Sequence, residues 1–194
     1  MASEATADRI TSAALRIFEK DGAEAVSMRR VASAVGITPM AIYRHFEDRE
    51  ALLNAIADGG FEDLAARFKG PQGKSSIEHI ENLTSGYLDF ALTRPRLFEY
   101  MFSSRRKGAR QFPKDFVAEK SPTANLLAMF VKEAMNSGEL RKDDVWEVTM
   151  TISAEAHGLI TLYMGGRFQL DEKNFKALFR RSIRRLVHGL ATGV

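Results

Sequence analysis

The side chains best suited to binding chemistry lie between Ser27 and Arg49. Two short segments there are separated by the tight turn Val35-Gly36-Ile37. They carry hydroxyl, phenol, imidazole and guanidinium groups, which donate hydrogen bonds to phosphate oxygens, and small apolar groups, which contact thymine methyls. This combination indicates contact with DNA. The candidate residues are Ser27, Arg29, Thr38, Pro39, Met40, Ala41, Tyr43, Arg44, His45 and Arg49.

We expect these residues to make few bidentate contacts to bases. The hydroxyl of Thr38 can bond a phosphate or a base, and Met40 and Ala41 can touch thymine methyls. The second of the two segments contains no Asn, Gln or Lys. Bidentate base contacts must therefore come from Arg29 or Arg44.

Two short helices must position these side chains. The first begins near Ser27, a good N-cap residue, and ends at Gly36. The second begins at Thr38-Pro39, where proline is favoured, and runs through Phe46. In a helix-turn-helix the second helix lies in the major groove and its first residues meet base edges. A helical hairpin inside an ordinary bundle would show the same spacing, so both interpretations stay open on spacing alone.

The charge counts do not by themselves require a nucleic-acid partner. The chain has 28 Lys and Arg against 25 Asp and Glu, a net charge of +3. Residues 1–50 hold seven cations and eight acids, whereas residues 26–49 hold four arginines against two acids. The candidate reading surface is thus mildly basic on an otherwise acidic segment.

Helical periodicity runs along the chain, and no segment alternates like a strand. The pattern predicts an all-α protein of about nine helices. We expect a three-helix, helix-turn-helix DNA-binding head over residues 1–50 and a helical bundle for ligand binding and dimerisation over residues 51–194. The expected N-cap residues of the later helices are Asp48, Ser121, Asp143 or Asp144, and Asp171.

Other chemistry has little support in the sequence. No cysteine is present, which excludes disulfides, thiolate zinc sites and cysteine nucleophiles. The four histidines form no His-Glu-x-x-His motif, and there is no Gly-x-Ser-x-Gly motif. We therefore expect no metal, no cofactor and no catalytic residues. The absence of a secretion signal and of an apolar run of about 20 residues favours a soluble cytoplasmic protein with no membrane partner.

One dense set of residues surrounds the predicted helix-turn-helix. It consists of Ala14, Ile17, Phe18, Gly22, Ala32, Gly36, Ile37, Ile42, Tyr43, Arg44, His45, Phe46, Arg49, Glu50, Leu52 and Leu53. Over about residues 6–58 this set resembles the DNA-binding signature of the tetracycline-repressor (TetR) family. The resemblance implies a homodimer that binds a near-palindromic operator and releases it when a small molecule enters the C-terminal domain.

The resemblance also implies roles for single residues. Tyr43 and His45 match the family's phosphate-contacting pair, and Thr38 and Met40 occupy positions of recognition-helix contacts. Arg49 stands where the family usually has Lys and keeps a cation there.

Two C-terminal stretches carry a second resemblance. Tyr87 to Phe102 and His157 to Phe168 are similar to a TetR subfamily named for a Trp-His-Gly signature. The signature has Trp one turn before the His, where this chain has Ser153, and the single Trp of the chain is Trp146.

An apolar cluster is the candidate effector site. Helical bundles bind small molecules between helices, on apolar side chains with a few polar groups. Ordinary core packing is the alternative for each residue of the cluster. The candidates are Phe90, Leu97, Phe98, Met101, Phe102, Phe130, Met150 and, as the polar group, His157.

The last two helices are the expected homodimer interface. Ala156, Gly158 and Ser182 are small enough to allow close approach of a four-helix contact. The many cations of the last helix are interpreted as a solvated face. A dimer places two reading heads at half-sites about one turn of DNA apart.

A helix over about residues 48–68 is expected to join the head to the body. We hypothesise that an effector packing near residues 97–102 shifts this helix and that Gly59-Gly60 is its compliant point. The predicted function is a DNA-binding transcriptional regulator, a repressor whose partners are double-stranded DNA, a small mainly apolar effector and a second copy. Two other classes stay open: a protein-interaction module that has lost specific DNA binding, and an enzyme on a helical bundle.

Overall fold

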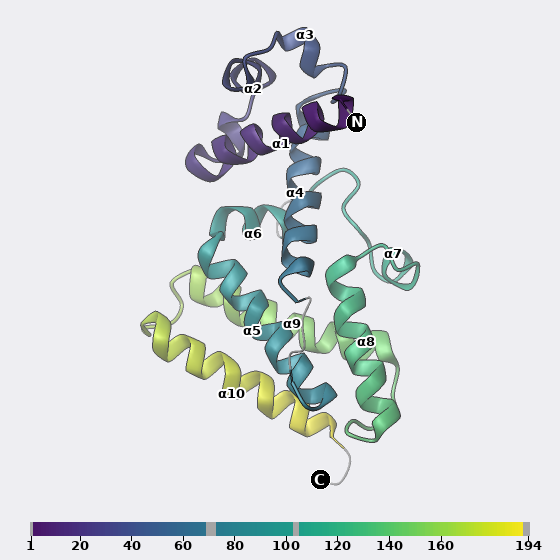
Figure 1. Ribbon diagram of the computed structural model, residues 1–194. Helices are drawn as coiled ribbons and strands as arrows, with labels where there is room; N and C mark the ends of the chain where they lie inside the picture. The colour runs from purple at the N-terminus through teal and green to yellow at the C-terminus, as the bar shows by residue number, and fades with distance from the viewer. Residues whose placement is uncertain (1, 69–72, 103–104, 192–194) are drawn as a thin grey trace. The chain divides into compact units, whose positions relative to one another are not determined.

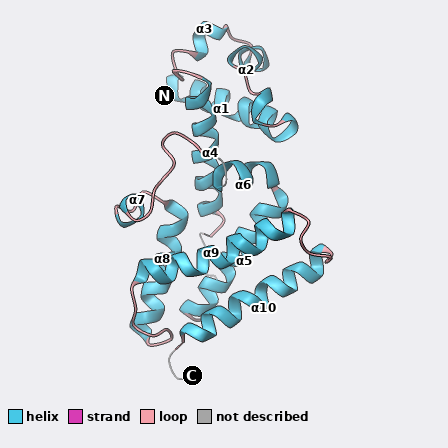
Figure 2. Ribbon diagram, turned by 180° about the vertical axis from the view of Figure 1, so that it is seen from behind, coloured by secondary structure: helices cyan, strands magenta, loops and turns pink. Residues whose placement is uncertain are grey.

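The computed structural model describes residues 2–68, 73–102 and 105–191, and the regular elements of these residues are helices (Figure 1; Figure 2). This confirms the all-α prediction, with ten α-helices and one 3-10 helix in the described residues where about nine helices were expected. The elements are α1 (Ala2–Asp21), η1 (Ala23–Ala25), α2 (Met28–Val35), α3 (Pro39–Ile42), α4 (Arg49–Ala66), α5 (Ser76–Thr93), α6 (Pro95–Phe102), α7 (Lys114–Val117), α8 (Pro122–Ser137), α9 (Val145–Met164) and α10 (Glu172–Leu190).

Packing divides the chain into two compact units. The first contains Met1–Glu62 and Arg94–Ala109, and the second contains Asp63–Thr93 and Arg110–Val194. α6 therefore belongs to the unit of α1, α2 and α3, although it follows α5 in the chain. The division passes through α4.

The first helix of the helix-turn-helix begins and ends at the expected residues, and the second begins at its expected cap. The Ser27 hydroxyl accepts a hydrogen bond from the amide of Arg30 at 3.2 Å, and Gly36 ends α2 in the left-handed conformation at φ 76°. The Thr38 hydroxyl accepts one from the amide of Ala41 at 3.3 Å. Each bond satisfies an amide that the first turn of a helix leaves unpaired.

The second helix of this motif is shorter than predicted. α3 ends at Ile42, so the prediction that it runs through Phe46 is wrong. The carbonyl of Ile42 accepts from the amides of both His45 and Phe46, at 2.8 and 3.0 Å, a shared pattern common at helix termini. Two residues later Asp48 caps α4 by accepting from the amide of Ala51 at 2.7 Å. An N-cap residue has a non-helical backbone, so one helix cannot run through it into the next.

Two arginines hold the start of α6 against the end of α1 in the first unit. The Nε of Arg94 donates to the carboxylate of Glu19 at 2.6 Å. Arg96 donates to the backbone carbonyls of Glu19, at 2.8 Å, and of Lys20. A cation at a helix C-terminus satisfies unpaired carbonyls and complements the helix dipole.

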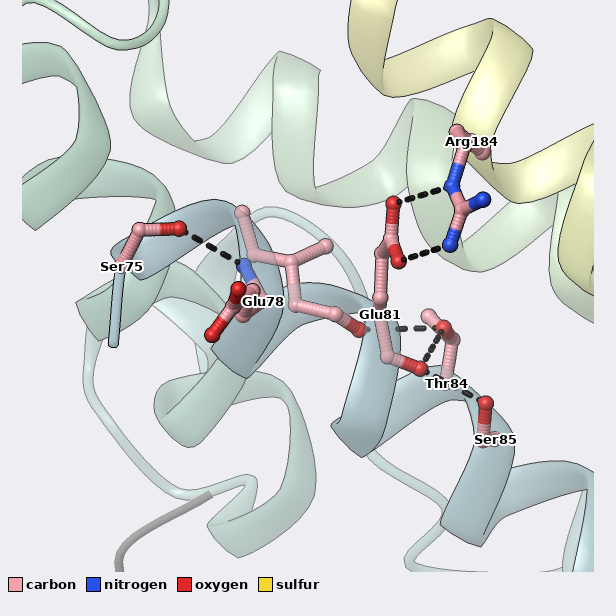
Figure 3. Close-up of polar contacts among 7 residues, drawn as sticks. Ser75, Glu78, Glu81, Thr84, Ser85 and Arg184 are labelled. Carbon is pink, nitrogen blue, oxygen red and sulfur yellow. Dashed lines mark hydrogen bonds and ion pairs between the residues drawn. The ribbon is translucent and has the colours of Figure 1, made fainter. Parts of the chain in front are cut away.

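The second unit is built on four helices in which α5 and α9 each pack against both α8 and α10. Phe90, Phe175 and Phe179 are fully buried in it. At the surface the guanidinium of Arg184 on α10 makes two parallel bonds to Glu81 on α5, at 3.0 and 3.1 Å (Figure 3). Among the described helices, none is both long and apolar enough to cross a bilayer.

Aspartates begin the last two helices, as predicted. Asp144 accepts from two amides of α9, at 2.8 and 2.9 Å, and Asp171 accepts from the amide of Asn174 at 2.7 Å. Ser121 departs from the prediction. Pro122 does begin α8, but the buried Ser121 side chain makes no capping bond.

Candidate nucleic-acid interface

The first turn of α3 and the residue after the helix expose large side chains to solvent. Met40 is 70% exposed and Tyr43 is 51% exposed, whereas Ile42 between them is fully buried. Ile42 anchors the helix in the core, so the opposite side of α3 faces outward. Exposed apolar and aromatic side chains grouped at one place are typical of a surface that binds a partner.

Hydroxyl groups at the starts of α2 and α3 remain able to donate. Ser27 and Thr38 are exposed, and in their caps each hydroxyl oxygen accepts a backbone hydrogen bond. A hydroxyl has one hydrogen in addition to its acceptor lone pairs, so both groups can still donate to a phosphate oxygen. Pro39 is exposed and Ala41 is half-buried on the same turn.

The predicted cations differ in what they already bind. The side chains of Arg29 and Arg44 are exposed and have no ion-pair or hydrogen-bond partner within the described ranges. Arg49, in contrast, donates through Nε to the carbonyl of Val26 and through Nη2 to the carbonyl of Ala23, both at 2.7 Å. Arg49 therefore holds the segment before α2 in place, a role that the sequence did not indicate.

Internal contacts account for much of the acidic charge of residues 1–50. Glu19 binds Arg94, and Asp21 binds Arg30. Glu24 lies 3.4 Å from Arg49, and Asp48 caps α4. These four acids thus serve the fold of the first unit, whereas Glu47 and Glu50 are exposed and follow Arg44 closely in the sequence.

The eight candidate effector-site residues lie in two packing environments. Leu97, Phe98, Met101 and Phe102 belong to the first unit, where the rings of Phe98 and Phe102 lie 5.0 Å apart. The members in the second unit are Phe90, Phe130, Met150 and His157.

His157 of α9 has a partner that sequence reasoning missed. Its Nδ1 lies 3.0 Å from the phenol oxygen of Tyr87 on α5. Burial raises the pKa of Tyr87 and lowers the pKa of His157, so both side chains are held in their neutral forms. The pair thus joins α5 and α9 of the second unit through polar side chains. In the sequence, Tyr87 showed only the spacing of a core residue.

The described part of the chain contains no group of three or more His, Asp or Glu side chains that could hold a metal ion. The pKa of Asp115 is lowered and the pKa of Lys176 is raised. Both side chains make ion pairs at the surface.

Comparisons with known proteins agree in both halves of the chain. Residues 10–56 match the family model for "Bacterial regulatory proteins, tetR family", and residues 80–186 match that for "Tetracyclin repressor-like, C-terminal domain". The chain is 24% identical over 194 residues to the HTH-type transcriptional regulator UidR of Escherichia coli K12, covering 98% of this chain and 95% of that protein.

Solved structures share the fold along nearly the whole chain. A protein of unknown function from Rhodococcus sp. RHA1 superposes with a TM-score of 0.81 at 26% identity, covering 96% of this chain and 95% of the other. The fatty acid degradation regulator FadR of Bacillus halodurans superposes with a TM-score of 0.71 at 16% identity, covering 94% and 98% of the two chains.

Proposed function

Because this chain belongs to the tetracycline-repressor family of bacterial regulatory proteins, we propose that it is a helix-turn-helix repressor released from its operator by a small molecule. The observation that carries the proposal is the exposure of Met40 and Tyr43 beside the buried anchor Ile42. It gives α3 an outward face that the protein's own core does not use.

The contacts to DNA divide by chemistry. Tyr43, His45 and the hydroxyl of Ser27 donate to phosphates, which position the protein without reading sequence. Met40 and Ala41 contact thymine methyls. The exposed arginines Arg29 and Arg44 supply bidentate contacts to guanine, and Thr38 and Pro39 set the start of the helix.

A homodimer formed through α9 and α10 presents two such heads. Leu162 is 47% exposed on α9, and a side chain at Gly158 would meet nothing within 4 Å, so a partner helix can approach there. Two heads read two half-sites, and the operator is therefore near-palindromic. The target is chromosomal DNA, which places the protein in the bacterial cytoplasm.

The effector is a small, mainly apolar molecule with a polar group. In the second unit, Phe90, Phe130 and Met150 supply the contact surface, and His157 with Tyr87 supplies a polar pair. The effector releases DNA to the extent that it binds the released state more tightly than the operator-bound state.

The test is binding to promoter DNA from beside the gene. The wild type, Tyr43→Ala/His45→Ala and the control His188→Ala, an exposed histidine on α10, are titrated against the promoter duplex and a scrambled duplex. We expect wild type and control to prefer the promoter, and the double variant to lose that binding. Equal, weak binding of the wild type to both duplexes would contradict the proposal and favour a protein-interaction module.

A further inference from the structure

An open groove of about 850 Å³ runs between α1 and α2 in the first unit. Ser27 and Arg29, two of the candidate DNA contacts, line it together with Arg30 and Ser33 of α2. Arg16 and Lys20 of α1 line the other wall. The groove is thus continuous with the proposed DNA interface and extends it onto a helix outside the helix-turn-helix.

The residues that α1 contributes lie on one face of that helix. Positions 13, 16, 17 and 20 follow the three- and four-residue spacing that brings side chains together on a helix. Ala13 is buried and Ile17 is half-buried, so they form the floor, and the exposed Arg16 and Lys20 form the rim. The groove therefore has a small apolar base and a cationic edge.

The charge of the groove is largely uncompensated. Four cations line it against the single acid Asp21, which is bound by Arg30. The side chains of Arg16, Lys20 and Arg29 have no ion-pair or hydrogen-bond partner in the residues that the structure describes. A groove with four basic side chains and one acid, which is already paired with Arg30, is expected to attract an anion of extended shape.

We propose that this groove holds the phosphate backbone of DNA beyond the bases read by α3, with Arg16 and Lys20 as phosphate-binding residues. The inference rests on the proposed function and lengthens the stretch of DNA that each head contacts. The contacts carry no sequence information, because phosphates are the same at every base pair. Each contact should release counterions and so steepen the salt dependence of binding.

The experiment compares wild type with Arg16→Gln/Lys20→Gln. Lys132→Gln, at an exposed lysine of α8, is the single-charge control, and thermal unfolding confirms that each variant is folded. Binding is measured over a salt series on the promoter duplex and on a scrambled duplex of equal length. Each of the two heads loses two phosphate contacts, four per dimer, so the salt slope should fall by about 3.6 and the affinity by on the order of 10³-fold near 0.1 M salt, on both duplexes alike.

The scrambled duplex separates this inference from the proposed function. A wild type that does not distinguish the two duplexes would overturn operator recognition, whereas the groove is judged by the salt slope on the scrambled duplex alone. An unchanged slope for the double variant would overturn the groove proposal even if the wild type selects the promoter. The groove proposal would likewise be overturned if the double variant bound DNA as the wild type does but no longer bound an acidic peptide that the wild type binds. That result would assign the groove to a protein partner.

Shortening the DNA supplies a second readout. On a duplex trimmed to the base pairs that the double variant protects from cleavage, the wild type should lose the advantage that Arg16 and Lys20 provide. The double variant should bind the long and trimmed duplexes alike. If the double variant binds both the long and the trimmed duplex more weakly than the wild type by the same factor, the two residues lie inside the half-site. That result would contradict a flanking contact.

Discussion

Gly60 on α4 faces Met101 on α6 so closely that a Cβ atom on the glycine would lie 2.5 Å from the sulfur of Met101. The same atom would lie 3.3 Å from Cδ2 of Leu97. Gly59, the adjacent residue on α4, has nothing within 4 Å of its Cβ position. Gly60 thus allows two helices of the first unit to approach, whereas Gly59 has no such role.

The two glycines therefore predict opposite results. Gly59→Ala should stabilise the protein by up to about 1 kcal/mol, because alanine favours the helix. Relative to Gly59→Ala, Gly60→Ala should lower the free energy of unfolding by about 1–3 kcal/mol, because Met101 must move out of a packed position. Thermal and denaturant unfolding of both variants measure the difference. Equal stabilities would contradict the close contact.

The same pair tests the hypothesis that Gly59-Gly60 is a compliant point. If flexibility matters, Gly59→Ala should change operator affinity or effector response without any packing cost. If operator affinity and effector response are unchanged in Gly59→Ala but altered in Gly60→Ala, the effect comes from the contact with Met101.

Arg49 is predicted to stabilise the fold in addition to any contact that it makes with DNA. Its removal leaves the carbonyls of Ala23 and Val26 without their donors, and hydrogen bonds from a charged group typically contribute about 2 kcal/mol. Arg49→Ala should therefore lower the free energy of unfolding by about that amount. Arg44→Ala, which removes an exposed and unpartnered arginine, should leave stability unchanged and weaken only DNA binding. Similar unfolding curves for both variants would contradict the role of Arg49.

His157 should make stability depend on pH. Burial lowers its pKa below the ordinary value of 6.5, so the unfolded chain takes up a proton at a higher pH than the folded chain does. The stabilisation is complete above pH 6.5 and is lost as the pH falls from there toward the lowered pKa. His157→Gln should flatten this part of the stability profile, whereas His188→Ala, at an exposed site, should not. A profile unchanged by His157→Gln would refute the assignment.

Glu139 should act as a helix cap brought from a distant part of the chain. Its carboxylate accepts hydrogen bonds from the amides of Ser76 and Ile77, each at 3.3 Å, at the start of α5. Burial raises the pKa of Glu139, but bonds from the hydroxyl of Ser137 and from these two amides outweigh it and lower the pKa overall. Glu139→Gln should cost about 1 kcal/mol near neutral pH, as loss of a cap does.

The dependence of stability on pH in the acid range provides the control for Glu139. A carboxylate with a lowered pKa contributes stability above the pKa of the unfolded chain, and this contribution disappears as the pH falls through the folded pKa. The difference between wild type and Glu139→Gln should therefore shrink in acid. Glu133→Gln, an exposed glutamate on α8, should show no such convergence.

Part of the candidate site could be predicted because its signals are local, although its contacts with DNA stay a prediction. The residues for α3 and its neighbours were identified from a capped, turn-separated pair of helices, and Met40 and Tyr43 are exposed as that motif requires. Arg49 could not be interpreted in the same way. Its partners lie 23 and 26 residues earlier, and only the folded first unit brings their carbonyls within 2.7 Å.

The sequence by itself determined where most helices begin and which faces they bury. Caps such as Ser27, Asp48 and Asp171 bond amides three residues away, so their geometry depends on almost nothing else in the chain. Helical spacing likewise assigns apolar residues to one face without reference to a neighbour.

Only the tertiary structure decided which distant residues meet. Tyr87 and His157 are 70 residues apart, and α6 belongs to the compact unit of α1, α2 and α3 although it follows α5 in the chain. The basic groove of Arg16 and Lys20 exists only because α1 and α2 lie side by side. Such contacts depend on how whole helix faces fit together, and no short stretch of sequence encodes that fit.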